Sequence, residues 1–511
     1  MNKSNIHTNL IGILKTLTVL FLLFVNIVVT IALFAVFNDA AKYLDNFFII
    51  ITLFFVAKII LSSKKSNYKI SWIIFLLLFP VVGLLFYLFY GRIHFNKKFK
   101  NQYFQMEEYG NQFIKQEPSI LDELKEKDID MFQQVELIRR DSSYPVNKNT
   151  EVTYLPIGED YFNAMLEELK KAEKFIFMQY FIVSDGRMHQ TLMDVLIEKS
   201  KAGVEVYYVY DVFGSIFSLP KHFRDRCKEH NINLLPFNEN FISLYHFISY
   251  RDHRKITVVD GKVGFTGGIN IGDEYINEVV RFGHWKDMGV MLKGDAVNSL
   301  SVIFLKSWGL FKNETIDFTK YINFENDIVN DTYVSSFDDG PIAKDVAEKN
   351  YLRMIASAKD YVYICTPYLI ISEEMISAID LACSSNVDVR ILTPHIPDKK
   401  VVFQLTRSFY GPLLEKGAKI FEYEPGFVHG KTMVVDDKVA FVGTINLDYR
   451  SLLWNFECGS WIYDKTFAST VKDDYLKTLD ISVEYTLEQH LHKNIVRHYF
   501  DAFLQIIAPL I

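Results

Sequence analysis

Hydrophobic residues follow two different patterns along the chain. Up to about residue 100 they form long runs with few charges, whereas residues 151–487 alternate short apolar runs of β type with helical patterns. This alternation is typical of α/β units, so the sequence predicts an α/β body that follows an apolar N-terminal region. The clearest predicted strands are residues 175–183, 204–210, 361–370 and 387–392.

The apolar runs near the N-terminus have the length of membrane spans. Residues 16–37 and 70–90 are uncharged runs of 22 and 21 residues, and each is long enough to cross a hydrocarbon core of roughly 30 Å. Residues 46–63 form a weaker candidate, interrupted by Lys58. The first run is too long for a signal peptide, and no small-residue cleavage site follows it. We therefore predict a membrane anchor of two or three transmembrane helices within residues 1–100.

The orientation of these helices depends on the run 70–90, because positive charges flank it on both sides. The two flanks cannot both be cytoplasmic if this run spans the membrane. The flanking charges are Lys64, Lys65 and Lys69 before the run and Arg92, Lys97, Lys98 and Lys100 after it. Either Pro80 and Gly83 mark a bent or re-entrant segment, or the run is a true span that departs from the charge rule. In both cases we predict that the rest of the chain is cytoplasmic.

One sequence unit occurs twice in the body. Residues 251–270 read RDHRKITVVDGKVGFTGGIN, and residues 426–446 read GFVHGKTMVVDDKVAFVGTIN. The two histidines are 176 residues apart, and the Lys at +2, the Asp at +7 and the Asn at +17 keep that spacing. A packing accident would not be expected to repeat in this way, so the duplication favours a functional role for the unit.

Weaker sequence similarities indicate that the duplication covers whole domains. GVEVYYVYD at residue 203 resembles NVDVRILTP at residue 386, and each repeat is then about 150 residues long, a typical domain size. The polar stretch 323–331 is the predicted joint between the halves. We predict a connecting segment at 101–150, a first half at 151–325, a second half at 332–487 and a C-terminal amphipathic helix at 488–511.

Each copy of the unit predicts a β-hairpin with its turn at Asp260-Gly261 or Asp436-Asp437. Strand alternation places the His and the Lys of each copy on one face, and the Asp on the opposite face or in the turn. A neutral imidazole beside a fixed ammonium suits attack on a phosphodiester, because the imidazole is the nucleophile and the ammonium offsets the anionic charge. The candidate catalytic residues are His253, Lys255, Asp260, His429, Lys431 and Asp436.

Structural roles are open for some of these residues. A single histidine at a strand end is commonly a hydrogen-bonded structural residue, and only the repetition argues otherwise. Asp260 and Asp436 either take a direct catalytic role or cap a turn, which Asp favours. Asn270 and Asn446 follow glycine-rich turns, where an amide can reach a phosphate oxygen or stabilise the turn itself.

Composition narrows the classes of partner. The formal net charge of −7 provides no overall basic field of the kind that holds nucleic acid, so no nucleic-acid partner is predicted. The cysteines are widely scattered and form no CxxC pair, which suggests neither a disulfide framework nor a zinc site. They are Cys227, Cys365, Cys383 and Cys458.

HxKxxxxD followed by a glycine-rich turn and Asn, present twice, resembles the phospholipase D superfamily. Within it the closer resemblance is to bacterial cardiolipin synthases. That resemblance rests on MQYFIVSD (178–185), KAGVEVYYVYDVFGS (201–215), TPYLIISEEMISAIDLA (366–382), YEPGFVHGKTMVVDD (423–437) and GTINLDYRSLLWNFE (443–457). Residues 71–92 resemble the membrane segment of these proteins, whereas the apolar run before them is extra.

The resemblance implies a duplicated phospholipase D-like fold, in which two pseudo-symmetric mixed-sheet α/β halves bring their hairpins to one active site. It implies a transfer between two phosphatidylglycerol molecules through a phosphatidyl-histidine, giving cardiolipin and glycerol at a bacterial cell membrane without a metal or organic cofactor. His253 is slightly preferred as the nucleophile. Lys255, Lys431, Asn270 and Asn446 would hold the phosphate. Glu457 and Asp287 match acidic positions that orient a histidine.

Two other classes of function are open: a hydrolase, which would use the same residues, and a membrane scaffold, which would not need them. A phosphodiester hydrolase, either a lipase or a nuclease, would share the chemistry with water as the acceptor. A non-catalytic membrane scaffold would explain the anchor but not two intact His-Lys pairs. The C-terminal helix places Ile495, Phe500, Phe503, Leu504 and Ile507 along one side, which suits either a bilayer surface or packing on the body.

Overall fold

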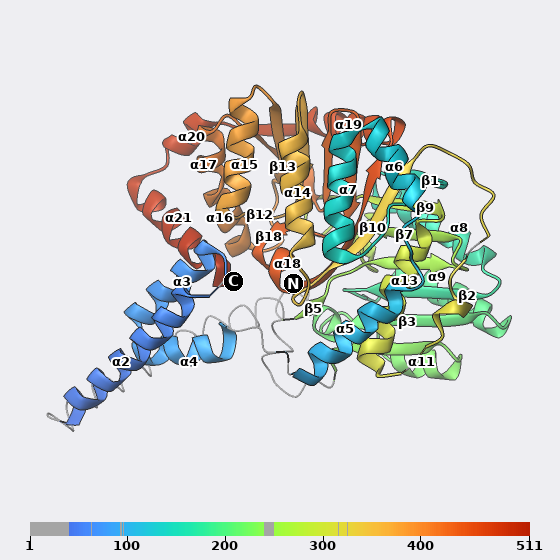
Figure 1. The fold of residues 1–511 in the computed structure, drawn as a ribbon, viewed down its shortest axis with the longest axis horizontal. Coiled ribbons are helices and arrows are strands. Elements are labelled where there is room, and N and C mark those ends of the chain that lie inside the picture. The colour runs from blue at the N-terminus through green and yellow to red at the C-terminus, as the bar shows by residue number, and fades with distance from the viewer. Residues whose placement is uncertain are drawn as a thin grey trace. The chain divides into compact units, whose positions relative to one another are not determined.

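The computed structural model describes residues 40–62, 64–91, 95, 97–239, 250–314, 316–323 and 325–510 (Figure 1). The predicted span at 16–37 lies outside these residues. The chain divides into two compact units, Met1–His94 with Ala502–Ile511, and Phe95–Asp501. The second unit is called the body below.

The first unit is built from helices α2 (Ala40–Ile60), α3 (Ser66–Leu78) and α4 (Pro80–Tyr90), together with the end of α21 (Ile495–Ile507) and η3 (Ala508–Leu510). Helix α3 packs on both α2 and α4, and the Trp72 and Tyr87 rings meet edge to face at 5.2 Å. The Ser71 hydroxyl donates to the Ile506 carbonyl at 2.5 Å, which joins the N-terminal helices to the C-terminal one.

The apolar run 70–90 is not one continuous helix. It breaks at Phe79, because Pro80 has no N–H to donate and disfavours helical geometry in the residue before it. Gly83 then permits a close approach of the two helices, since a Cβ there would lie 2.8 Å from the Phe75 carbonyl oxygen. The break agrees with the bent-segment interpretation of the sequence, and a membrane span over this run stays a prediction.

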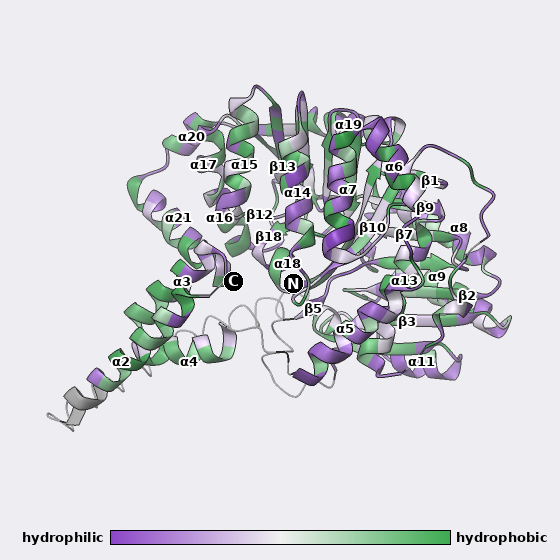
Figure 2. Cartoon of the chain, viewed as in Figure 1, coloured by the Kyte–Doolittle hydropathy of each residue, from purple (hydrophilic) through white to green (hydrophobic). Residues whose placement is uncertain are grey.

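The surface of these helices is strongly apolar, as the hydropathy colouring of α2, α3 and α4 shows (Figure 2). Ile50, Phe54, Leu78 and Phe89 are each more than 60% exposed. Among the helices of the described ranges, none has both the length and the apolar composition needed to cross a membrane. The transmembrane helices therefore stay a prediction.

The first half of the body is a seven-stranded sheet in the order β1-β9-β7-β6-β2-β3-β4. Strands β2, β3 and β4 are parallel, and the others pair antiparallel. The strands are β1 (Thr150–Leu155), β2 (Phe175–Tyr180), β3 (Glu205–Asp211), β4 (Asn233–Phe237), β6 (Ile256–Val259), β7 (Val263–Gly267) and β9 (Gly289–Gly294). Its helices and turns are α8 (Gly158–Lys171), α9 (Arg187–Lys201), α10 (Val212–Ser215), α11 (Phe223–Glu229), η1 (Asp273–Ile276), α13 (Val297–Lys312) and η2 (Phe318–Lys320).

The second half repeats that strand order with one further strand, as β10-β19-β17-β16-β11-β13-β14-β20. These strands are β10 (Tyr333–Asp339), β11 (Tyr361–Cys365), β13 (Asp388–Pro394), β14 (Lys419–Tyr423), β16 (Thr432–Val435), β17 (Val439–Gly443), β19 (Asn455–Tyr463) and β20 (Ser482–Tyr485). Its helices are α14 (Val346–Ser357), α15 (Glu373–Ser384), α16 (Lys400–Ser408), α17 (Tyr410–Glu415), α18 (Tyr449–Leu453), α19 (Lys465–Leu479) and α20 (Leu487–Leu491). The predicted duplicated, mixed α/β architecture is confirmed.

Two short pairings cross from one half to the other. Strand β5 (Arg251–Asp252) of the first half pairs parallel with the start of β19 in the second. Conversely, β15 (Gly426–Val428) of the second half pairs parallel with β8 (His284–Lys286) of the first. Each crossing strand directly precedes the histidine of its own half. A further small pair joins β12 (Leu369–Ile370) to β18 (Leu447–Asp448).

The predicted connecting segment 101–150 forms part of the body. It folds into α5 (Lys97–Asn111), α6 (Pro118–Lys127) and α7 (Ile129–Ser142). Helix α5 packs on α13 of the first half, whereas α7 packs on α14 and β10 of the second. The buried side chain of Gln134 accepts from the Trp461 indole at 2.7 Å and donates to Ser357 at 2.9 Å. The segment therefore fastens both halves.

The C-terminal helix α21 carries several exposed apolar side chains. Ile495, Val496 and Tyr499 are about 70% exposed, and Phe500 and Phe503 are half exposed. Leu504, predicted on the same side, is instead buried.

The aspartates of the repeated unit lie in the hairpin turns. Asp260 adopts the left-handed conformation with φ 53°, and Asp436 does so with φ 52°, which Asp tolerates better than most residues. Each carboxylate accepts three backbone N–H groups from the start of the neighbouring strand, at 2.7–3.0 Å. The donors are Glu173, Lys174 and Phe175 for Asp260, and Lys359, Asp360 and Tyr361 for Asp436.

These contacts correct the expectation of a direct catalytic role for Asp260 and Asp436. Both carboxylates have their acceptor capacity taken up by the backbone, at the end of the hairpin away from the His-Lys pair. They anchor β2 and β11 to the hairpins and thereby position those pairs.

Replacing Asp260 by Ala removes the acceptor of three backbone N–H groups. We expect the free energy of unfolding to fall by about 2 kcal/mol or more, because charge-assisted hydrogen bonds are lost. The thermal unfolding midpoint of purified protein in detergent measures this change. Asp225→Ala is the control, since the Asp225 side chain is 71% exposed and lies 3.4 Å from the similarly exposed His222. Equal midpoints for the two variants would contradict the anchoring role.

Candidate active site

Each candidate histidine is held in place by the opposite half of the body. His253 directly follows β5, and its backbone N–H donates to the Phe456 carbonyl at 2.9 Å. His429 directly follows β15, and its N–H donates to the Lys286 carbonyl at 2.7 Å. In both cases the accepting residue is followed in the sequence by an acid, so the cross-half pairing places that acid beside the histidine.

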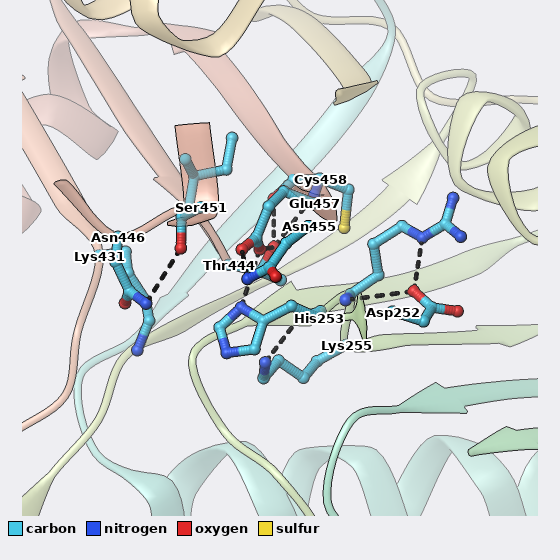
Figure 3. Close-up of polar contacts among 12 residues, drawn as sticks. Asp252, His253, Lys255, Lys431, Thr444, Asn446, Ser451, Asn455, Glu457 and Cys458 are labelled. Atoms are coloured by element: carbon cyan, nitrogen blue, oxygen red, sulfur yellow. Dashed lines mark hydrogen bonds and ion pairs between the residues drawn. The ribbon is translucent and has the colours of Figure 1, made fainter. Parts of the chain in front are cut away.

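The two acids bind the Nδ1 atoms of the histidines. The Glu457 carboxylate lies 2.9 Å from His253 Nδ1, and the Asp287 carboxylate lies 2.7 Å from His429 Nδ1. Both acids are completely buried behind the rings (Figure 3 shows the Glu457 side). Because a carboxylate accepts, each Nδ1 carries the hydrogen, and each Nε2 keeps a lone pair for a substrate.

The resemblance implies that Glu457 and Asp287 orient a histidine, and the structure places each acid beside a histidine Nδ1, where it sets the tautomer and the orientation of the ring. A direct substrate contact of either acid stays a prediction.

The lysines lie beside the histidines in a strongly desolvated site. Lys255 and Lys431 are fully buried, and the ammonium group of each donates to the backbone carbonyl of the histidine two residues before it. The histidines themselves are only 8% and 7% exposed. The predicted arrangement of His and Lys together is therefore present in both halves.

Burial sets the protonation of this site before substrate enters. It lowers the pKa of Lys255 to about 7 and that of Lys431 to about 8, because an ammonium is costly away from water. Burial and the adjacent Lys431 lower the pKa of His429 to about 4. Burial, Lys255 and Lys431 hold the pKa of His253 well below its usual value. Both imidazoles are thus neutral at pH 7.

The asparagines differ in how they are used. Asn270 accepts from the Ile182 N–H and donates to the Tyr275 hydroxyl, both at 3.0 Å, so it ties together the loop around the site. Asn446 donates to Ser451 at 3.2 Å, while its side-chain oxygen is buried and has no partner among the described residues. A direct phosphate contact of either amide stays a prediction.

The surroundings of the two histidines are not equivalent. The His429 ring is enclosed by Tyr275, Trp285 and Phe427, with centroids 5.2–5.9 Å away, whereas His253 contacts Phe181 at 5.0 Å. The sequence analysis missed these rings, because a buried aromatic residue next to a motif has no local signal that separates site wall from core.

The acids are also held differently. Thr444 donates to Glu457 at 2.5 Å, and Asn455 donates to it at 3.1 Å. The repeat places Gly268 at the position of Thr444, and a Cβ there would lie 2.0 Å from the Asp287 carboxylate. Asp287 instead accepts from the Met288 N–H at 3.0 Å and the Trp285 indole at 3.3 Å.

A buried charge network supports the His253 side. Arg254 is 2% exposed and donates to Asp252 at 2.8 Å, with Asp338 at 3.4 Å. Lys306 pairs with Asp338 at 3.6 Å and with Glu107 of α5 at 2.8 Å. The network joins β5 to the second half and to the connecting segment, and no short motif in the sequence indicates it.

The donor set decides what the site can bind. The two buried lysines offer hydrogen-bond donors and positive charge, which suit an oxyanion, while the Nε2 lone pair of each neutral imidazole offers a nucleophile or a proton acceptor. A phosphodiester placed between the two Nε2 atoms could be attacked by one ring and have its leaving group protonated by the other.

Comparisons with known proteins agree with this geometry. A protein-family model described as "Cardiolipin synthase, PLD-like domain" matches residues 165–306 and 351–479. A second, described as "Phospholipase_D-nuclease N-terminal", matches residues 47–92. The two matched stretches of the first family correspond to the two halves of the body.

Individual relatives cover nearly the whole chain. An uncharacterized protein of Streptococcus mutans is 39% identical over 455 residues, 88% of this chain and 98% of the relative. A protein of Halalkalibacterium halodurans named cardiolipin synthase is 33% identical, over 91% of this chain and 93% of the relative. The crystal structure of a phosphatidylserine synthase from Haemophilus influenzae shares the fold, with a TM-score of 0.56 and 14% identity over 73% of this chain and 100% of that one.

The lowered lysine pKa values predict that anion binding depends on pH. A bound anion favours the ammonium form and raises the pKa of both lysines, so above about pH 7 binding must take up protons. We expect the affinity for sulfate, which does not titrate in this range, to fall between about pH 7 and pH 9 by up to tenfold per pH unit for each proton taken up.

Calorimetry in buffers of different ionisation enthalpy measures both the affinity and the proton uptake. Lys431→Met should weaken sulfate binding and reduce the uptake by about one proton at pH 9. Lys171→Met, on an exposed helix end, is the matched control. An affinity that is constant or rises with pH would show that the lysines do not bind the anion.

Proposed function

This chain belongs to the cardiolipin synthase family of phospholipase D-like proteins, and from this membership and the geometry of its site we propose that it is a cardiolipin synthase. It transfers the phosphatidyl group of one phosphatidylglycerol to a terminal hydroxyl of another, which yields cardiolipin and glycerol. The observation that carries this proposal is the pair of histidines with free Nε2 atoms, each oriented by an acid from the opposite half.

In the first half-reaction, His253 Nε2 attacks the phosphorus of the donor lipid. The bond from phosphorus to the glycerol oxygen breaks as the N–P bond forms, and His429, which takes up a proton when the anionic phosphodiester enters, gives that proton to the departing glycerol. Lys255 and Lys431 offset the charge on the non-bridging oxygens, with Asn270 and Asn446 as further donors. No metal or organic cofactor takes part.

In the second half-reaction, the neutral His429 removes the proton from the hydroxyl of the acceptor lipid. That oxygen attacks the phosphatidyl-histidine, the N–P bond breaks, and His253 returns to its neutral form. The same histidine serves as acid and then as base, so the cycle closes without any net change in protonation.

The surroundings support this division of roles. A nucleophile must be neutral, and burial together with Lys255 and Lys431 holds the pKa of His253 well below its usual value. Hydrogen bonding to Asp287 opposes the effect of burial on His429 and favours its protonated form, which a general acid requires.

The substrates place the enzyme at a membrane. We propose that the first unit holds it in a bacterial cell membrane, with the N-terminal helices in the bilayer and the body in the cytoplasm. The exposed apolar side chains of α2, α3 and α4 support this location, because soluble surfaces rarely carry so many together. A reporter fused to the C-terminus tests the orientation.

A hydrolase would use the same first half-reaction and water in the second. Cross-half pairing alone does not separate the two functions, and the family membership favours the transferase. A nuclease is disfavoured by the net charge of −7.

The purified protein, incubated with labelled phosphatidylglycerol in detergent micelles, should produce cardiolipin and free glycerol. We expect His253→Ala and His429→Ala each to reduce the rate at least about 10³-fold, because each removes the nucleophile or the proton carrier. Lipid chromatography follows both products. His222→Ala is the control, since this histidine is an exposed residue far along the sequence from either motif.

The products discriminate between the functions. Phosphatidic acid as the sole lipid product would identify a phospholipase D. No turnover of any phospholipid would support the non-catalytic membrane scaffold instead. Retained cardiolipin formation in either His→Ala variant would contradict the assigned roles.

The acids are positioning residues, and Asp287 also raises the pKa of His429, so removing its charge should lower that pKa further. Burial raises the pKa of Glu457 to about 7, so Glu457→Gln removes little charge in acid solution, and we expect the acid limb of kcat/KM to stay in place. For Asp287→Asn we expect the alkaline limb to move to lower pH, because its histidine must carry a proton.

Both variants should lower kcat by about 10- to 100-fold, with a smaller change in KM. Glu488→Gln on exposed α20 is the control. If Asp287→Asn moved the acid limb instead of the alkaline limb, His429 would be the nucleophile. If only stability changed, the acids would be structural.

A further inference from the structure

Arg251 lies beside the nucleophile but has no role in the chemistry described above. It belongs to β5, two residues before His253, and is in register with Asn455 of β19. Its guanidinium stacks on the Phe213 ring at 4.1 Å. Its Nε is buried and has no hydrogen-bond partner among the described residues. A buried donor of this kind is costly unless a ligand satisfies it.

A second arginine from the opposite half increases the positive charge at this point. Arg450 stands on α18, which leads directly into the β19 segment that pairs with β5. Burial and the charge of Arg450 together lower the pKa of Arg251 to about 9. Two arginines that repel each other in a desolvated place are stabilised when an anion binds between or beside them.

The nearby acids are engaged elsewhere. Asp211 accepts the N–H groups of Gly214 and Asp252, both at 2.8 Å. Asp448 caps α18 by accepting the Ser451 N–H at 2.6 Å. They oppose the repulsion between the arginines through space, but neither is a hydrogen-bond partner of the Arg251 Nε.

We propose that Arg251, with Arg450 beside it, binds the phosphodiester of the acceptor phosphatidylglycerol. The inference rests on the proposed transferase function. It separates the anion sites of the two lipids: Lys255 and Lys431 hold the reacting phosphate of the donor, and Arg251 holds the non-reacting phosphate of the acceptor.

The reaction itself requires such a site. The acceptor hydroxyl and the acceptor phosphate are joined by a single glycerol unit, so the second half-reaction brings the acceptor phosphodiester close to the anionic oxygens of the phosphatidyl-histidine. At a separation of roughly 7 Å and an effective dielectric constant of about 20, their repulsion alone would weaken acceptor binding by about 50-fold. A cation placed at the acceptor phosphate offsets this repulsion. Glycerol or water, being neutral, needs no such cation.

Two reactions on the same micelles separate the acceptor site from the common chemistry. Cardiolipin formation uses an anionic acceptor. Exchange of labelled free glycerol into phosphatidylglycerol uses the same donor and the same phosphatidyl-histidine but a neutral acceptor. For Arg251→Gln we expect the ratio of cardiolipin formation to glycerol exchange to fall by about 30-fold or more.

Arg251→Lys keeps the charge and should recover part of that ratio. Arg187→Gln, an exposed arginine paired with Glu278, is the matched control and should keep the wild-type ratio. If Arg251→Gln is too unstable to purify, Arg450→Gln tests the same site, with a fall in the ratio expected in the same direction.

The outcomes distinguish this inference from the proposed function. An unchanged ratio, or an equal loss of both reactions in folded Arg251→Gln, would overturn the acceptor site, because Arg251 would then be idle or would serve the donor step. Wild-type protein that exchanges glycerol but forms no cardiolipin would instead overturn the proposed synthase.

Discussion

The pairing of β5 with β19 and of β15 with β8 is the constraint on which the site depends. Each pairing fixes a histidine by a backbone hydrogen bond to one residue and delivers the next residue, an acid, to the Nδ1 of the same histidine. Neither half therefore contains a complete His-acid pair of its own. A relative shift of the halves by one residue would turn both acids to the opposite side of their strands, since side chains alternate along a strand. The connecting helices α5 and α7 and the buried Arg254 network oppose such a shift.

Desolvation gives the empty site its chemical character. Burial lowers the pKa of each histidine and of each lysine and so favours their uncharged forms. The charged forms are therefore costly until an anion binds. An entering phosphodiester supplies the missing charge, and the interactions it makes are strong because little water screens them. The same cost that makes buried lysines unfavourable for folding therefore contributes to substrate binding and to the stabilisation of charge in the transition state.

Much of this could be predicted from the sequence, and the failures have physical reasons. A constant spacing of 176 residues shows that a whole domain is duplicated, and strand alternation is enough to put His253 beside Lys255. The aspartates were harder, because a turn-capping Asp and a catalytic Asp have the same local pattern, and only the three N–H groups around Asp260 separate them. The pairing of His253 with Glu457 spans 204 residues and depends on the docking of the halves, which no local pattern encodes. The break at Pro80 was visible in the sequence, since proline acts on its immediate neighbours.

The two histidine sites of the duplicated fold are not equivalent. The acids differ in length by one methylene, and the residue opposite each compensates for that difference: Thr444 donates to the longer Glu457, whereas Gly268 leaves room for the shorter Asp287. Any side chain at position 268 would collide with the carboxylate that holds His429. Converting one histidine site into the other therefore requires at least two coordinated changes, and each change alone disturbs an acid on which a histidine depends. This coupling maintains an asymmetric site within a symmetric fold, and an asymmetric site is what a reaction with separate donor and acceptor lipids requires.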